Sequence, residues 1–125
     1  MLDGNQPIYL QLADQIRRQV LEGHLSEGEQ VMSTTQYAQV LRINPATVAK
    51  AFAELTRDGV IYRRRGIGMF VAEGALEALL QERRDAYFGS VLTPALEEAR
   101  RLGLDSRAVA GFVTEFLETA EGGER

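Results

Sequence analysis

Two helix-start signals that follow each other closely constrain this chain more than any other feature. Ser33-Thr34-Thr35-Gln36 has the Ser-x-x-Gln pattern of a capping box, in which two side chains satisfy backbone N–H groups at a helix N-terminus. Asn44-Pro45 joins a preferred N-cap residue to the residue best suited to the first helical position. A turn of a few residues around Arg42 and Ile43 separates the two predicted helices, which is the skeleton of a helix-turn-helix.

A basic hairpin is predicted directly after the second of these helices, which we expect over residues 45–58. Residues 60–71 hold two β-prone runs around a tip that contains Arg64, Arg65, Gly66 and Gly68. Turn geometry alone explains the glycines, and they also let the backbone approach a phosphate beside the arginines. A helix-turn-helix followed by a basic hairpin is a winged helix-turn-helix. We therefore expect a mainly α fold with a small β-hairpin.

Apolar periodicity supplies a core for this unit. A first helix, beginning at Pro7 and ending before Gly23, repeats apolar residues every four positions. The helix over 45–58 has an apolar stripe of its own. The two stripes consist of Ile8, Leu12, Ile16 and Val20, and of Val48, Ala51, Phe52 and Leu55.

The net charge of −4 is unevenly distributed along the chain. Residues 1–72 carry a small positive net charge, whereas residues 73–125 are clearly acidic. A local basic face can attract a polyanion even on an acidic protein, because only the local field has to attract phosphates. Charge alone leaves open the alternative of an ordinary solvated surface.

Composition excludes several classes of site. The chain has no cysteine and one histidine, His24, which excludes disulfides, thiolate sites and multi-histidine metal sites. Glu97 and Glu98 are neighbours on a predicted helix and point apart, so they do not form a carboxylate pair. We expect no enzyme activity, no cofactor and no metal. The chain also lacks a long apolar run and a signal-peptide pattern, which favours a cytoplasmic protein.

The face of the helix 45–58 opposite its apolar stripe is the candidate for reading bases. Thr47 could donate to a phosphate or a base, Lys50 could meet a phosphate or guanine, and Ala46 could offer a methyl contact to thymine. Taken alone, these three residues fit a plain solvent face equally well. The neighbouring hairpin favours DNA. The predicted DNA-binding residues are Ser33, Thr35, Ala46, Thr47, Lys50, Arg64, Arg65, Gly66 and Gly68.

The motifs of residues 6–72, in this order and spacing, resemble GntR-type winged-helix transcription regulators. The short remainder after the hairpin is similar to the YtrA-type branch of that family. The resemblance implies a homodimer that binds an inverted-repeat operator, usually as a repressor, and often at genes for ABC-type membrane transporters. It rests on Pro7-Ile8-Tyr9-x-Gln11-Leu12, Leu21-Glu22-Gly23-x-Leu25, Asn44-Pro45-x-Thr47-Val48-x-Lys50-Ala51, Glu54-Leu55, Asp58-Gly59-Val60-Ile61 and Arg64-Arg65-Gly66-x-Gly68-x-Phe70-Val71.

Two positions depart from the family pattern. Thr35 stands where the family usually has an arginine, and Ala46 stands where it often has a larger polar residue. Both changes remove reach and charge from the predicted DNA face. We therefore expect either an operator that differs from the usual one of the branch or a hairpin that carries more of the affinity.

Residues 1–72 are thus expected to form the DNA-binding domain, and residues 73–125 an all-helical dimerisation region. Thr93-Pro94 indicates either the start of a new helix or a kink in a long one. Asp105 or Ser106 caps a last helix. Two or three short helices cannot bury this much apolar surface among themselves, so we expect a second copy to cover it. The predicted interface residues are Leu76, Leu79, Leu80, Tyr87, Phe88, Val91, Val109, Phe112, Val113 and Phe116.

Two alternatives stay open. Winged helices also serve as protein-docking modules, although three consecutive arginines and two glycines in the hairpin favour phosphate. A small-molecule effector could occupy a crevice beside Arg83, Arg84 and Tyr87, for which ordinary surface residues are the simpler interpretation. The implied partners are duplex DNA and a second copy of the chain, with no membrane.

Overall fold

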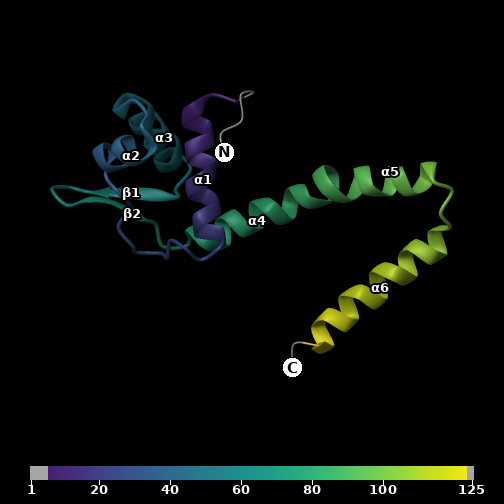
Figure 1. Ribbon diagram of the computed structural model, residues 1–125. Helices are drawn as coiled ribbons and strands as arrows, with labels where there is room; N and C mark the ends of the chain where they lie inside the picture. The colour runs from purple at the N-terminus through teal and green to yellow at the C-terminus, as the bar shows by residue number, and fades with distance from the viewer. Residues whose placement is uncertain (1–5, 124–125) are drawn as a thin grey trace. The chain divides into compact units, whose positions relative to one another are not determined.

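The computed structural model describes residues 6–123, so residues 1–5 and 124–125 of the two predicted regions lie outside the described residues (Figure 1). The chain divides into two compact units, Met1–Glu82 and Arg83–Arg125. The first unit therefore extends beyond residue 72, where the sequence placed the boundary.

Before α4 (Ala75–Tyr87), the described part of the first unit contains three helices and a hairpin in the predicted order. The elements are α1 (Ile8–Leu21), α2 (Thr34–Leu41), α3 (Pro45–Arg57), β1 (Ile61–Arg64) and β2 (Gly68–Val71). The two strands pair antiparallel, with Ile61 opposite Val71 and Arg64 opposite Gly68. This arrangement confirms the mainly α fold with a small hairpin, and Figure 1 shows α2 and α3 grouped beside the hairpin.

Local hydrogen bonds start the helices where the sequence predicts. Ser33 and Gln36 form the capping box, and Asn44 caps α3 through the N–H of Ala46. The first helix begins one residue later than expected, with Pro7 at the N-cap position. The turn between α2 and α3 places Arg42 in the left-handed region at φ +57°. This conformation ends α2 abruptly and lets α3 start a few residues later.

One core holds the first unit together. The stripes of α1 and α3 face each other, except for Ile8, which is 44% exposed and lies outside the core. The hairpin closes the third side of the core. Tyr37 of α2 meets Phe52 of α3 edge-on with ring centroids 5.8 Å apart, and burial raises the pKa of the Tyr37 phenol. The largest fully buried side chains are Leu12, Ile16, Val20, Val48, Leu55, Ile61 and Val71.

Residues 28–31 extend the hairpin on the β2 side. Val31 donates its N–H to the carbonyl of Met69 at 2.9 Å, and Gly28 donates to the carbonyl of Val71 at 2.8 Å. Gln30 forms an isolated antiparallel bridge with Phe70. Because β2 is paired on both edges, the hairpin is anchored to the body of the domain.

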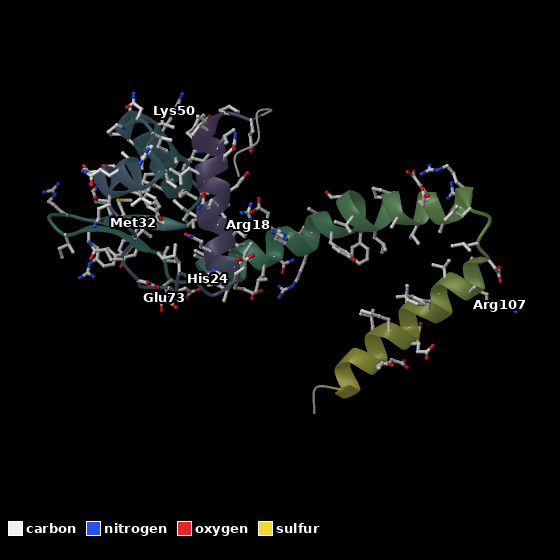
Figure 2. All side chains as sticks on the ribbon, in the orientation of Figure 1. Arg18, His24, Met32, Lys50, Glu73 and Arg107 are labelled. Atoms are coloured by element: carbon white, nitrogen blue, oxygen red, sulfur yellow. The ribbon has the colours of Figure 1, made fainter. Side chains whose placement is uncertain are left out.

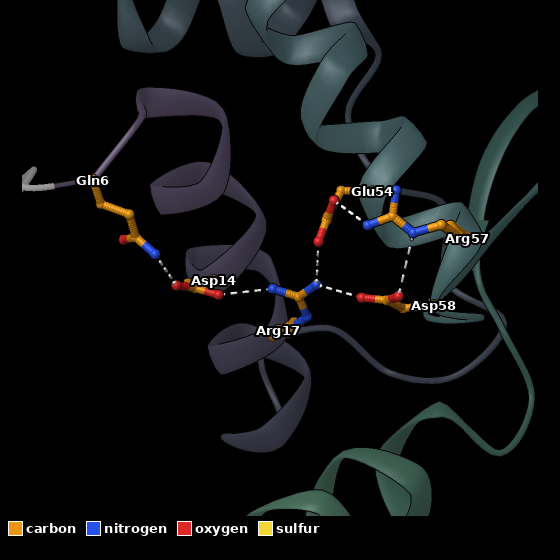
Figure 3. Close-up of polar contacts among 6 residues, drawn as sticks. All are labelled: Gln6, Asp14, Arg17, Glu54, Arg57 and Asp58. Atoms are coloured by element: carbon orange, nitrogen blue, oxygen red, sulfur yellow. Dashed lines mark hydrogen bonds and ion pairs between the residues drawn. The ribbon is translucent and has the colours of Figure 1, made fainter.

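Arg17 links α1 to the end of α3. Its guanidinium lies 2.7 Å from a carboxylate oxygen of Asp14 and 2.7 Å from one of Asp58, and 3.8 Å from Glu54 (Figure 3). Arg57 also pairs with Glu54. Surface ion pairs are individually worth about 1 kcal/mol or less. Arg17 and Glu54 are half-buried, and these pairs connect α1 to the C-terminal end of α3.

The remaining helices are α4 (Ala75–Tyr87), a π-helical turn η1 (Phe88–Leu92), α5 (Thr93–Arg101) and α6 (Ser106–Gly123). The start of α4 belongs to the first unit, because Ala75 and Leu79 are 2% and 5% exposed and join its core. Burial of these two side chains explains why the first unit extends past residue 72.

Pro94 is accommodated without a break in the helical backbone. Thr93 has helical dihedrals, so it is not the N-cap of a separate helix. Its N–H bonds to the carbonyl of Phe88 across a wider π turn, and its hydroxyl donates to the same carbonyl at 2.7 Å. The π turn provides room for a residue that lacks an N–H, which supports the alternative of one long, perturbed helix.

Glu27 caps the start of α4 from the loop that follows α1. Its carboxylate accepts the N–H of Leu76 at 3.1 Å. Backbone N–H groups of Gly74 and Leu76 hold the pKa of Glu27 below its ordinary value of 4.5. A lowered pKa in the folded state means that the ionised carboxylate stabilises the fold above pH 4.5. This contribution disappears as the pH falls through the folded-state pKa.

We expect Glu27→Gln to have a lower urea midpoint of unfolding than the wild type at pH 7, because glutamine keeps an acceptor but no charge. At pH 3 the midpoints of the variant and the wild type should differ much less. The exposed Glu73, which has no hydrogen bond or ion pair within residues 6–123, provides the control Glu73→Gln. An effect of Glu27→Gln that is the same at both pH values would show that the charge does not cap α4.

Candidate nucleic-acid interface

The first turn of α3 presents short side chains on a fixed backbone. Asn44 accepts the N–H of Ala46 through its side chain at 2.8 Å and the N–H of Thr47 through its carbonyl at 2.9 Å. Ala46 is exposed and Thr47 is half-buried, whereas Val48 lies in the core. The groups that this turn offers outward are therefore a methyl group and a hydroxyl group.

Lys50 is exposed on the next turn of α3 (Figure 2). Its ammonium group lies 4.8 Å from the ring centroid of Tyr9 on α1. A cation–π contact at an exposed site contributes about 0.5–1 kcal/mol, enough to bias the side chain toward one orientation. Lys50 thus presents its charge at the edge of α3 that faces α1.

The N-terminus of α2 offers backbone donors. The Ser33 hydroxyl accepts the N–H of Gln36 at 3.1 Å, so this oxygen is used within the capping box. The N–H groups of Thr34 and Thr35 have no acceptor inside the helix, because the first turn of any helix lacks preceding carbonyls. These two donors are what this helix end can offer to an anion.

The tip of the hairpin is a tight turn. The N–H of Ile67 donates to the carbonyl of Arg64 at 2.9 Å, and Gly66 at the third turn position has φ +78°. This is the geometry of a type II turn, which favours glycine there. Arg65 is exposed in the turn, while the guanidinium of Arg64 lies 4.7 Å from the ring centroid of Phe70. The two arginines therefore have different surroundings.

Gly68 has a packing role. It has φ +145°, and a Cβ atom at this position would lie 2.6 Å from Nε2 of Gln30. The same Nε2 donates to the carbonyl of Ile67 at 3.0 Å. The side chain of Gln30 therefore lies against the turn, and the positive φ of residue 68 is the feature that favours glycine there.

Arg63 is one of the three consecutive hairpin arginines that favour phosphate, but it is not among the predicted DNA-binding residues. It pairs across the hairpin with Met69, and both line a groove of ≈ 470 Å³ beside α3. Side chains alternate along a strand, so Arg63 shares the face of the buried Ile61. This period of two was the signal in the sequence that could have placed Arg63 toward α3. Arg63 forms no ion pair within the part of the chain that the structure describes.

The predicted dimer residues fall into separate environments. Leu79 is buried in the core of the first unit, where Leu76 is exposed and Leu80 half-buried. In the second unit, Phe112 and Phe116 stack with centroids 6.3 Å apart. Val109 there is half-buried, and the exposed predicted residues are Tyr87, Phe88, Val91, Phe112, Val113 and Phe116. Arg83 and Arg84, suggested beside an effector, are also exposed.

The described residues form neither a metal site nor a membrane span. Among the side chains that the structure describes, those of residues 6–119, no three acidic or histidine groups gather in a way that could hold a metal ion. No helix within residues 6–123 is long and apolar enough to cross a membrane.

Comparisons with known proteins agree on one family. The family model described as "Bacterial regulatory proteins, gntR family" matches residues 8–71. The chain is 32% identical to the HTH-type transcriptional regulator YhcF of Bacillus subtilis over 92% of this chain and 93% of that protein. It is 29% identical to the HTH-type transcriptional repressor YtrA of the same organism over 95% and 91%. A crystal structure of a transcriptional regulator from Oenococcus oeni superimposes with TM-score 0.77 at 29% identity, covering 94% and 96%.

We expect Gly68→Ala to destabilise the protein by about 1–3 kcal/mol, because alanine at this φ is strained and its Cβ displaces Gln30. Gly66→Ala is the matched control. It also has a positive φ but faces open space, so it should cost only about 1 kcal/mol. Chemical denaturation of both variants measures the difference, and equal losses would contradict a contribution from the contact with Gln30.

Proposed function

The chain belongs to the GntR family of bacterial regulatory proteins, in its YtrA-type branch, and we propose that it acts in the cytoplasm as a homodimeric repressor of an inverted-repeat operator. Family membership makes it a transcriptional regulator with a DNA-binding domain, and not an enzyme. The observation that carries the proposal is the combination, within one domain, of a capped and exposed α3 N-terminus and an arginine-bearing wing. The name of the relative YtrA supports repression rather than activation.

In the proposed complex, α3 enters the major groove by its N-terminal end. Thr47 and Lys50 contact base edges or phosphates there, and Ala46 offers its methyl group. The hairpin lies on the adjacent backbone or in the minor groove with Arg65 at its tip. The donors of Thr34 and Thr35 hold a phosphate at the start of α2.

The two departures from the family pattern reduce the share of the DNA affinity that base contacts supply. Thr35 and Ala46 are both exposed but short, so neither reaches far toward a base. Sequence-independent contacts from the arginines 63–65 then supply a larger share of the affinity. Binding should therefore depend strongly on salt, because each neutralised phosphate releases counterions.

The second unit supports dimerisation because it has no core of its own. None of its described side chains, over residues 83–119, is buried. Short helices are marginal in water unless an apolar face is packed. A second copy would cover these faces, and the resulting two-fold symmetry would place two α3 helices on two half-sites.

We expect the protein to bind the DNA upstream of its own gene about 10³-fold more tightly than unrelated DNA of equal length. Fluorescence anisotropy at several salt concentrations measures both affinities. Arg65→Ala should weaken binding to both duplexes and reduce the salt slope by about one counterion per half-site.

Three results would count against this function. An unchanged salt slope for Arg65→Ala would remove the wing tip from the interface. Equal and weak binding to both duplexes would contradict sequence-specific regulation through this site. Absence of binding to any duplex at low salt would favour the protein-docking module instead.

We expect the protein at micromolar concentration to show about twice the 13.9 kDa mass of one chain by light scattering. Replacing two exposed aromatic residues, in the double variant Phe112→Glu with Phe116→Glu, should shift it toward the monomer. The exposed wing residue Ile67 provides the control Ile67→Glu, which should leave the mass unchanged. A single wild-type species at the mass of one chain would refute the dimer.

A further inference from the structure

Lys50 is the only lysine of the chain. The sequence contains 14 lysine and arginine residues together, so arginine supplies every other cationic side chain of this kind. The two residue types differ in their reactivity. A guanidinium group keeps its proton in proteins, whereas an ammonium group can release one and become a nucleophilic amine. Reactions that need a side-chain amine are therefore confined to one exposed position on α3.

The amine of Lys50 is not held by an ion pair. Its ammonium group lies 4.8 Å from the ring centroid of Tyr9, and no carboxylate pairs with it in the described part of the chain. Glu54 lies one helical turn farther along α3 and is the acid best placed to reach it. The Glu54 carboxylate instead pairs with Arg57 and lies 3.8 Å from Arg17. The Lys50 amine is thus left available to other reactants.

Short side chains surround Lys50 on the surface of α3. Ala46 lies about one helical turn before it, Ala53 lies about one turn after it, and Ala49 precedes it in the chain. All three alanines are exposed. A small molecule can therefore approach the amine without displacing a larger side chain of the same helix.

An acyl phosphate is a reagent that such an amine accepts. The neutral amine attacks the carbonyl carbon, a C–N bond forms, and the C–O bond to the phosphate breaks. The phosphate leaves with the electron pair of that bond, and the proton lost by the amine passes through water to the phosphate. The product is an uncharged amide. It no longer attracts a DNA phosphate, and it loses the cation–π contact with Tyr9.

We propose that Lys50 is an acyl-acceptor site, and that its acylation by an acyl phosphate lowers the affinity of the protein for DNA. The inference rests on the proposed function, in which Lys50 contacts base edges or phosphates. It adds a means of regulation that requires no effector pocket. Because one amine serves both reactions, bound DNA protects Lys50 from acylation, and acylation opposes DNA binding.

The test treats the full chain with acetyl phosphate and measures modification and DNA binding separately. Peptide mapping by mass spectrometry determines whether Lys50 carries an acetyl group. Anisotropy with a fluorescein-labelled duplex of unrelated sequence then compares each protein with its own untreated sample at low salt. The acetylated wild type should bind about tenfold more weakly, because each protomer has lost one charged contact. Saturating unlabelled duplex, added before the reagent, should slow the acetylation of Lys50.

Two variants separate this site from general effects of the reagent. Lys50→Arg has no lysine, so treatment should leave its own DNA affinity unchanged. Combining it with Arg18→Lys moves the single lysine to an exposed position on α1, well separated from Lys50 (Figure 2). This double variant should be acetylated at its lysine, should keep the affinity of its untreated sample, and should not be protected by DNA.

Three outcomes would overturn the acylation site and leave the proposed function standing. The first is the absence of an acetyl group on Lys50 after treatment. The second is equal DNA binding by the wild type before and after acetylation. The third is an equal loss of binding in the double variant. Failure of the untreated wild type to bind any duplex at the lowest salt would instead overturn both the site and the proposed function.

Discussion

The structure depends on the packing of α3, which has to serve two surfaces at once. Its stripe of Val48, Ala51, Phe52 and Leu55 forms one wall of the core, so rotation of the helix would expose this stripe to water. Burying a side chain of this size contributes about 1.5–3 kcal/mol, which far exceeds any surface contact of the helix. The outward face of α3 is therefore decided by the core, and the ion pairs of Arg17 only connect its C-terminal end to α1.

The two units of the chain obtain their stability in different ways. The first has a shared core of helices and hairpin, completed by Ala75 and Leu79 from α4. The second has amphipathic helices but no described buried side chain over residues 83–119, so its helices depend on surfaces outside a single copy of the unit. DNA affinity and assembly are thus linked through the proposed dimer, because a monomer presents only one α3.

The parts of the fold that the sequence predicts are those determined by neighbouring residues. Ser33 and Asn44 start helices through hydrogen bonds to residues two or three positions away, and the turn glycines act through their own dihedrals. Leu79 was predicted to lie in the dimer interface, but it is buried in the core of the first unit. An apolar stripe in a sequence does not indicate whether the same chain or a second copy covers it. The groove beside Arg63 was not predicted because it depends on how α2, α3 and the hairpin pack against each other, although strand alternation indicated the direction of that side chain. The sequence left open whether Thr93-Pro94 starts a new helix or perturbs a long one. The π turn that distinguishes these alternatives has no distinct sequence pattern.

The alanines on the outward face of α3 have a consequence for how this regulator could change during evolution. Ala46, Ala49 and Ala53 are exposed, and none takes part in the core. A longer side chain at any of them would extend away from the packed interior, at little cost to stability. Ala46, which lies at the N-terminal end of α3, is therefore open to a single substitution that would add a base contact in the proposed complex. The scaffold can acquire a different target sequence in small steps, while the residues that fold it are left untouched.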